Sequence, residues 1–330
     1  MNLLVVGMGS IGRRHVRAFK AAGVDTIAGV DTRQDRLDQA HQELGLDDLG
    51  LDFRTMLEKG RYDAVVVAVP GAWHTPIAIA AAEAGCDLFI EKPLADKSDG
   101  LDRLEKIAAD KKLVAYTAYC YRFAPASERM KQIVDSGKLG RVYSAKLNLS
   151  TYLPDWHPWE DYRSSYAAKL DQGGGARLDD SHGVDLLRWL FGDVARIYAE
   201  VDKISGLEID ADDLAIMILR FRNETVGEVH LDFFGQPPRV HAEIIGSRGT
   251  LLWDRISGRV EVYDTEEKSW SVDDFGKDSF VTCYDRQAVH FLECVRDRKP
   301  TRTPLSDGRK TLAVLEAALR SSQGGHAIRL

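Results

Sequence analysis

Lys92 is the first residue whose setting suggests proton transfer. It lies between Glu91 and Pro93, directly after the apolar run of residues 87–90. A lysine at the end of a buried strand can hydrogen-bond a substrate hydroxyl and help to move its proton, while the proline restricts the backbone after it. The alternative is a surface lysine in a strand-to-helix turn, and this segment taken alone favours that alternative.

His182 is the second such residue. It lies in residues 177–191, which follow three consecutive glycines and have the pattern of a helix. Asp179, His182, Asp185 and Trp189 follow one another at intervals of three or four residues, and therefore lie on the same helix face. A carboxylate near a histidine can hold one imidazole tautomer and stabilise its charged form, so we expect Asp179 to orient His182 as a general base.

The alternative for His182 is a histidine satisfied inside the core, and an isolated histidine favours that interpretation. No second histidine or cysteine lies at the spacing of metal ligands, so no metal site is predicted.

An aromatic loop, residues 152–163, precedes the glycine run. Its large rings are costly to leave in a loop unless they cover something, and aromatic faces stack on sugar rings and bases. Arg163 can pair bidentately with a phosphate or carboxylate. We expect Tyr152, Trp156 and Arg163 to contact a substrate, with the loop closed over it. The equally weighted alternative is an arm that packs on a neighbouring subunit.

The first thirty residues have the pattern of a strand, a glycine-rich turn and a helix that could bind a phosphate-containing ligand. The motif Gly7-x-Gly9-x-x-Gly12 stands between an apolar strand and an amphipathic helix. Gly7 allows the tight turn, Gly9 admits a pyrophosphate, Gly12 lets helix and strand pack closely, and the helix start at Ser10 and Ile11 faces the phosphates. In that context the motif predicts a dinucleotide site; a flavin or methyl-donor site, or a plain glycine-rich turn, is the alternative.

The nature of the dinucleotide is indicated by Asp31, at the end of the second predicted strand. Its carboxylate can accept hydrogen bonds from both ribose hydroxyls of the adenosine and would repel a 2′-phosphate, so NAD is predicted over NADP. Arg33, just past the strand, can pair with a 2′-phosphate and is the competing determinant.

Strands and helices alternate over residues 1–119, which predicts a doubly wound parallel sheet, that is, an α/β Rossmann domain. Such sheets bind ligands at the carboxyl ends of their strands, where the glycine loop, Asp31, Pro70 and Lys92 fall. Residues 120–330 predict a second α/β domain with an open, largely antiparallel mixed sheet. Its predicted strands are 141–153, 195–201, 214–221, 224–234, 240–245, 249–253 and 258–263.

Composition and charge indicate which classes of binding partner the chain can have. The chain has 330 residues, of which 44% are hydrophobic, enough for two cores. The net charge of −7 without a basic stripe argues against nucleic-acid and membrane-surface partners. No apolar run is long enough to span a membrane, and Met1 directly precedes the first strand, so we expect neither a membrane anchor nor a signal peptide. Four cysteines without paired spacing suggest reduced thiols and a cytoplasmic location.

Together these residues resemble the Gfo/Idh/MocA family of oxidoreductases over the whole chain. The resemblance rests on the glycine loop, on Pro70 with His74, on Glu91-Lys92-Pro93, on Arg122-Phe123 and on the helix with His182. It implies a Rossmann domain, a second domain with an open sheet, and a homodimer or homotetramer formed through that sheet. Val69, Pro70, His74, Glu91 and Lys92 would lie at the cofactor.

The resemblance implies an NAD-dependent enzyme that acts on a ring alcohol or ketone of a sugar, cyclitol or nucleotide sugar. His182 would take the hydroxyl proton while hydride leaves the carbon, and Lys92 would hold the same oxygen. Arg122 joins Tyr152, Trp156 and Arg163 as an expected substrate contact. Two alternatives remain: an NAD-dependent glycosidase that oxidises a ring carbon transiently, and a regulator that senses a dinucleotide without catalysis.

Overall fold

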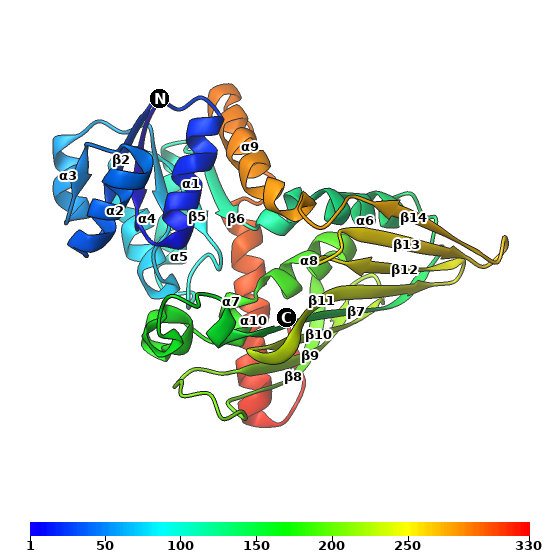
Figure 1. The fold of residues 1–330 in the computed structure, drawn as a ribbon. Helices are drawn as coiled ribbons and strands as arrows, with labels where there is room; N and C mark the ends of the chain where they lie inside the picture. Colours follow the sequence, from blue (N-terminus) through cyan, green and yellow to red (C-terminus); the bar gives the residue numbers. More distant parts are fainter. The chain divides into compact units, whose positions relative to one another are not determined.

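The computed structural model describes all 330 residues, and the chain divides into two compact units (Figure 1). Unit 1 comprises Met1–Tyr119 and Tyr284–Arg309, and unit 2 comprises Cys120–Cys283 and Lys310–Leu330. Residues 284–309, which were predicted in the second domain, fall in unit 1 of this division. Helix α9 (Cys283–Asp297) carries the apolar side chain of Phe291, which packs edge-to-face on Phe19 and Phe89 in the core of unit 1.

Unit 1 contains a sheet of six parallel strands in the order β3-β2-β1-β4-β5-β6. This order confirms the doubly wound parallel sheet expected from the alternation of strands and helices. The strands are β1 (Asn2–Val6), β2 (Thr26–Val30), β3 (Leu49–Gly50), β4 (Ala64–Val67), β5 (Asp87–Glu91) and β6 (Ala115–Ala118).

The helices of unit 1 connect these strands and bury their apolar faces. In α1, for example, Val16, Ala18 and Phe19 are buried while Arg17 between them is exposed. The helices are α1 (Ser10–Ala21), α2 (Gln34–Leu44), α3 (Phe53–Lys59), α4 (His74–Glu83), α5 (Leu101–Asp110) and nearly all of α9, with a short 3₁₀ turn, η1 (Gly71–Trp73), before α4.

Unit 2 contains a mixed sheet of nine strands in the order β14-β13-β12-β11-β7-β10-β9-β8-β15. Only the central pair β7 and β10 is parallel, which confirms the open, largely antiparallel sheet. The strands are β7 (Val142–Tyr152), β8 (Val194–Asp202), β9 (Leu214–Phe221), β10 (Val226–Asp232), β11 (Phe234–Gly246), β12 (Gly249–Asp254), β13 (Arg259–Asp264), β14 (Ser269–Asp274) and β15 (Ile328–Arg329).

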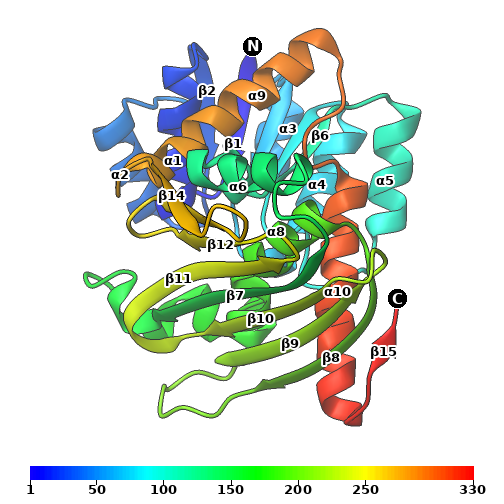
Figure 2. The same ribbon diagram turned by 90° about the vertical axis from the view of Figure 1, so that its right-hand side faces the viewer.

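Helices cover one face of this sheet and leave the other open (Figure 2). Along β8, Ile197 and Ala199 are buried while Tyr198 between them is exposed, as alternation across a half-covered sheet requires. The helices of unit 2 are α6 (Pro125–Asp135), α7 (Ala176–Asp179), α8 (His182–Phe191) and α10 (Leu305–Gly324), whose first turn belongs to unit 1. None of the helices has the length and apolar character that crossing a bilayer requires.

The single helix expected over residues 177–191 is instead two helices. Asp180 departs from helical geometry (φ −88°, ψ 26°), so α7 ends at Asp179 and α8 begins at His182. The aromatic loop also has local structure, because residues 153–172 form a series of 3₁₀ turns. These are η3 (Leu153–Asp155), η4 (Tyr162–Ser164), η5 (Tyr166–Ala168) and η6 (Leu170–Gln172); η2 (Cys120–Phe123) and η7 (Ser279–Thr282) lie elsewhere in unit 2.

Candidate active site

The glycine loop joins β1 to α1 in unit 1, and close packing requires two of its glycines. Gly7 has a φ of +100°, and a Cβ there would lie 2.2 Å from the carbonyl oxygen of Ala68. A Cβ on Gly12 would lie 1.7 Å from the carbonyl oxygen of Gly7. A Cβ on Gly9 would meet only the Arg36 guanidinium, 3.8 Å away. The chain's own packing does not require Gly9 to be glycine, so its open side fits the close approach of a ligand phosphate.

Asp31 lies where β2 ends and is buried against this loop. Its Oδ2 accepts a hydrogen bond from the Met8 amide (2.9 Å) and its Oδ1 accepts one from the Arg33 amide (2.9 Å). Nη1 of Arg36 is 3.4 Å from Oδ2. A buried carboxylate bonded to the glycine loop fits the adenosine ribose of a dinucleotide.

Two arginines near Asp31 differ in their partners. The Arg33 side chain pairs with its neighbour Asp35, with Nη2 at 2.5 Å from Oδ2, and holds the pKa of that carboxyl below its usual range. Arg36 instead lies beside both Asp31 and Gly9. Sequence analysis missed Arg36; its position one turn into the helix after Asp31 was the available signal.

His74 follows the end of β4 and is 1% exposed. Its Nδ1 lies 2.8 Å from the carbonyl oxygen of Pro93, and its Nε2 lies 2.7 Å from that of Val69. Burial lowers the pKa of His74 even though both carbonyls favour the charged form. Both ring nitrogens of His74 thus contact the backbone of unit 1, and its cofactor contact stays a prediction; Val69 and Pro70 follow the end of β4.

Glu91 is also buried, at the end of β5. Its Oε1 is 2.6 Å from Nε2 of His15, and its Oε2 accepts a hydrogen bond from the backbone amide of Lys92 at 2.9 Å. The carboxylate expected at the cofactor thus lies inside unit 1, and Lys92 follows it at the carboxyl edge of the sheet. Nothing in the sequence pattern indicates the His15 contact, since the two residues are 76 positions apart.

His182 begins α8 in unit 2 and has an aromatic neighbour that sequence analysis missed. The ring of Tyr121, from η2, stacks on the imidazole with centroids 4.2 Å apart and planes 15° apart. Phe280 meets the Tyr121 ring edge-on at 4.8 Å. A parallel aromatic face restrains the imidazole and favours its charged form, which is useful for a base that takes up a proton. The available signal was the tyrosine next to Arg122.

Asp179 lies at the end of α7 and accepts a hydrogen bond from the Tyr166 hydroxyl. Because α7 and α8 are separate helices, Asp179 and His182 do not share one continuous helix face, and that part of the expectation is corrected.

Asp185 and Arg122 form a buried ion pair in unit 2. Nε of Arg122 donates to one carboxylate oxygen (2.9 Å) and Nη2 donates to the other (2.6 Å), with side-chain exposures of 4% and 0%. Its guanidinium carbon also lies 5.9 Å from the ring centroid of Trp189. The charge of Arg122 is therefore balanced inside unit 2 by Asp185, and its substrate contact stays a prediction.

The aromatic loop packs on its own unit. The Trp156 indole nitrogen donates to Thr151 (3.1 Å), and its ring meets Phe233 edge-on. Arg163 binds Asp161 through Nε and Nη2, and Glu208 through Nη1 (2.7 Å). An anionic ligand at Arg163 would compete with two carboxylates already present.

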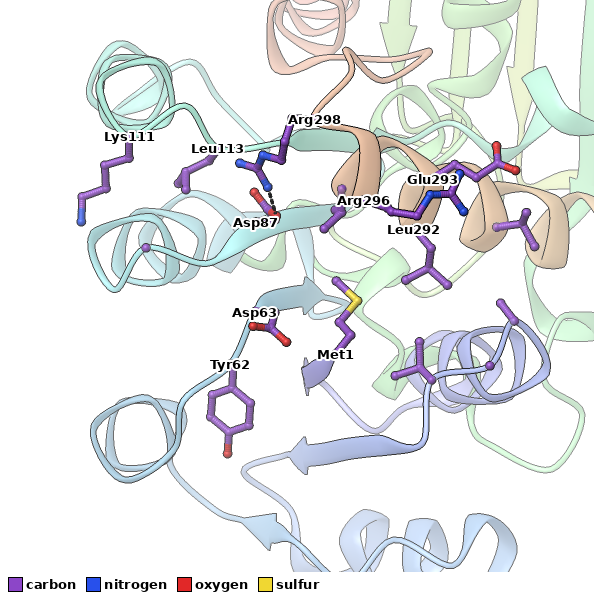
Figure 3. A pocket seen from close by; sticks show the side chains of 16 residues that line it. Met1, Tyr62, Asp63, Asp87, Lys111, Leu113, Leu292, Glu293, Arg296 and Arg298 are labelled. Carbon is purple, nitrogen blue, oxygen red and sulfur yellow. Dashed lines mark hydrogen bonds and ion pairs between the residues drawn. The ribbon is translucent and has the colours of Figure 1, made fainter.

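A cavity of about 730 Å³ lies in unit 1 at the opposite, amino ends of the strands (Figure 3). Asp63 precedes β4 and Asp87 begins β5, whereas the glycine loop and Lys92 lie where strands end. Asp87 is paired with Arg298 at 2.6 Å, and Asp63 accepts the Asn2 amide at 2.7 Å. Ligands of doubly wound sheets bind at the carboxyl edge, so this cavity is not the candidate site.

Comparison with known proteins identifies relatives over the whole chain. Residues 1–119 match the Gfo/Idh/MocA profile described as an oxidoreductase family, NAD-binding Rossmann fold, and residues 131–330 match that of its C-terminal alpha/beta domain. The chain is 25% identical to myo-inositol 2-dehydrogenase of Thermotoga maritima, covering 100% of this chain and 98% of that protein. It is 25% identical to levoglucosan dehydrogenase of Pseudarthrobacter phenanthrenivorans, over 89% and 82%.

Solved structures share the fold. A levoglucosan dehydrogenase in complex with NADH and levoglucosan has a TM-score of 0.88 at 21% identity, covering 100% of this chain and 99% of that one. The WlbA dehydrogenase from Bordetella pertussis, in complex with NADH and UDP-GlcNAcA, has a TM-score of 0.84 at 25% identity, covering 100% and 98%.

Proposed function

The chain belongs to the Gfo/Idh/MocA family of oxidoreductases, and on this premise we propose that it transfers a hydride between NAD and a ring carbon of a sugar, cyclitol or nucleotide sugar. The observation that carries the proposal is the buried Asp31 carboxylate bonded to a glycine loop whose Gly9 has an open side. Similarity to inositol and levoglucosan dehydrogenases over most of their length supports the substrate class.

The proton is handled by two side chains. His182 accepts the hydroxyl proton at its imidazole while hydride leaves the carbon that bears the hydroxyl. The stacked Tyr121 ring stabilises the imidazolium that results. Lys92 hydrogen-bonds the reacting oxygen through its ammonium group and supports the developing negative charge. Asp179 remains our choice for the acid that orients His182. The bound nicotinamide would supply the redox chemistry, and the protein supplies position and charge.

NAD is the preferred dinucleotide in this proposal. The 2′-phosphate of NADP would approach the Asp31 carboxylate, and the nearest guanidinium, that of Arg36, is already beside that carboxylate. The Gly7, Gly12, Ser10 and Ile11 backbone would line the pyrophosphate at the start of α1.

The open face of the unit 2 sheet supports a homodimer or homotetramer. Large side chains on it, including Tyr198 (45% exposed) and Ile218 (51% exposed), lie on neighbouring strands in register. Exposed apolar side chains on a flat sheet face favour association. Light scattering of the purified protein measures the state directly; a monomer at micromolar concentration contradicts this part.

The test of function is a substrate screen. Purified protein with NAD is mixed with myo-inositol, levoglucosan, common hexoses and nucleotide sugars, and the near-ultraviolet absorbance of NADH is followed. We expect NADH to accumulate with at least one ring alcohol and to disappear when the matching ketone is supplied. Sugar release from a glycoside without accumulation of NADH would instead indicate the glycosidase, and tight NAD binding with no turnover would indicate a regulator.

A further inference from the structure

Two buried histidines contact the segment that carries Lys92, one on each side. His15 is 0% exposed and its Nε2 lies 2.6 Å from Oε1 of Glu91, the residue before Lys92. His74 is 1% exposed and its Nδ1 lies 2.8 Å from the carbonyl oxygen of Pro93, the residue after it. The residues on both sides of Lys92 are therefore contacted by histidine side chains that are buried from solvent.

The contact through His15 reaches the Lys92 backbone itself. The other oxygen of Glu91 accepts the Lys92 amide at 2.9 Å, so a single carboxylate joins His15 to Lys92. Burial raises the pKa of Glu91, but the contact with His15 and the charge and backbone amide of Lys92 together outweigh it and leave that pKa below its usual range. The carboxylate thus stays ionised near neutral pH and can accept both bonds.

Each histidine also ties the Lys92 segment to a part of the carboxyl edge that would seat the dinucleotide. His15 lies in α1, whose first residues follow the glycine loop. The second nitrogen of His74 contacts the carbonyl oxygen of Val69, directly before Pro70, at 2.7 Å. Packing alone does not require these polar groups, since His15 is otherwise surrounded by rings such as Phe89, 4.8 Å away. Burying the Glu91 carboxylate against an imidazole is seldom the most stable choice, because apolar residues of similar volume often replace buried charged groups without loss.

We propose that His15 and His74 are positioning residues for Lys92: through Glu91 and Pro93 they hold its backbone in a set position relative to the dinucleotide-binding loop. The inference rests on the proposed role of Lys92 in catalysis. It implies that the cofactor seat and Lys92 move as one body. Misplacing a catalytic group by about 1 Å lowers turnover by roughly 10²-fold, so a modest loosening of this segment would be visible in kcat.

The test separates the effect of His15 on the position of Lys92, measured by kcat, from its effect on protein stability, measured by Tm. His15→Leu leaves the Glu91 carboxylate buried without its histidine, so we expect both Tm and kcat to fall. The double variant His15→Leu/Glu91→Met removes that buried charge, so Tm should recover toward the wild type. We expect kcat to stay lower by roughly 10- to 100-fold with little change in KM for NAD, because the bond to the Lys92 amide is still missing. Recovery of kcat together with Tm overturns the proposal.

Two further variants serve as controls for the role of His15. His15→Gln keeps a side-chain donor and should retain more of kcat than His15→Leu, which also decides the matter if the double variant does not fold. Tyr116→Phe removes a buried hydroxyl that bonds Gln287 at 3.0 Å in the same core but leaves the His15–Glu91 contact in place. It should lower Tm without lowering kcat; equal losses of kcat in Tyr116→Phe and His15→Leu would reduce His15 to a packing residue.

Amide hydrogen exchange tests the positioning without any substrate. We expect the peptide that contains Lys92 to exchange faster in His15→Leu and in the double variant, but not in Tyr116→Phe. Unchanged exchange in both His15 variants overturns the proposal. Full turnover of Lys92→Met would instead refute the proposed function of Lys92, and the exchange result would still show whether the histidines hold its backbone.

Discussion

Replacing Asp31 by serine tests the dinucleotide assignment most directly. An ionised carboxylate offers about four acceptor positions. The amides of Met8 and Arg33 and the guanidinium of Arg36 take three of them. About one strong position remains for a ribose hydroxyl. Asp31→Ser should therefore weaken NADH binding by about 1–3 kcal/mol, a factor of roughly 5–150 in Kd.

The same change should improve the binding of NADPH. It removes the charge that would repel a 2′-phosphate, and it leaves the Arg36 guanidinium without the carboxylate at 3.4 Å. Arg36 is about one-third exposed, so a phosphate contact there is partly screened by solvent, and we expect a gain of about tenfold. Fluorescence titration of NADH and NADPH measures both constants.

The matched control for this gain is Asp31→Ser/Arg36→Ala, which should lose the improvement for NADPH while binding NADH no better. Because Asp31 also holds the Met8 and Arg33 amides, Tm of each variant shows whether the loop survives. A wild type that prefers NADPH, or an Asp31→Ser variant with unchanged NADH affinity, would refute the reasoning and point to Arg33 or Arg36 as the determinant.

Three further expectations concern unit 2. His182→Ala should lower kcat by about 10²–10⁴ with NADH affinity unchanged. At the neighbouring Tyr121, Tyr121→Phe should keep most of the activity and Tyr121→Leu should not. If His182→Ala and both Tyr121 variants turn over at the wild-type rate, His182 is a packing residue. Arg122→Met should destabilise the protein by about 3–5 kcal/mol in denaturant unfolding, because the Asp185 carboxylate is left buried and unpaired, whereas adding Asp185→Leu should restore most of that loss. Arg163→Ala should raise KM for the substrate without changing NADH affinity or oligomer size; smaller species in light scattering with normal turnover would make the loop an interface arm.

What the sequence determined by itself is local. Residues 2–31 indicated a strand, a glycine turn, a helix and a second strand, because each depends on neighbours in the chain: a Cβ on Gly12, for example, would collide with the carbonyl oxygen of Gly7. Alternation of strands and helices predicted the parallel sheet, and consecutive strands predicted the antiparallel one. These patterns follow from backbone geometry and from which face of an element is buried, so they can be read without knowing the partner.

Tertiary structure decided which distant groups meet. Helical spacing placed Asp179 and His182 on one face, but the turn at Asp180 separates them onto two helices. The contact of Arg122 with Asp185, 63 positions along the chain, was not predicted from the sequence. The contact of His15 with Glu91 has the same origin. Such pairs form because a buried charge must find a partner wherever the fold places one, and the periodicity of a sequence carries no record of that partner.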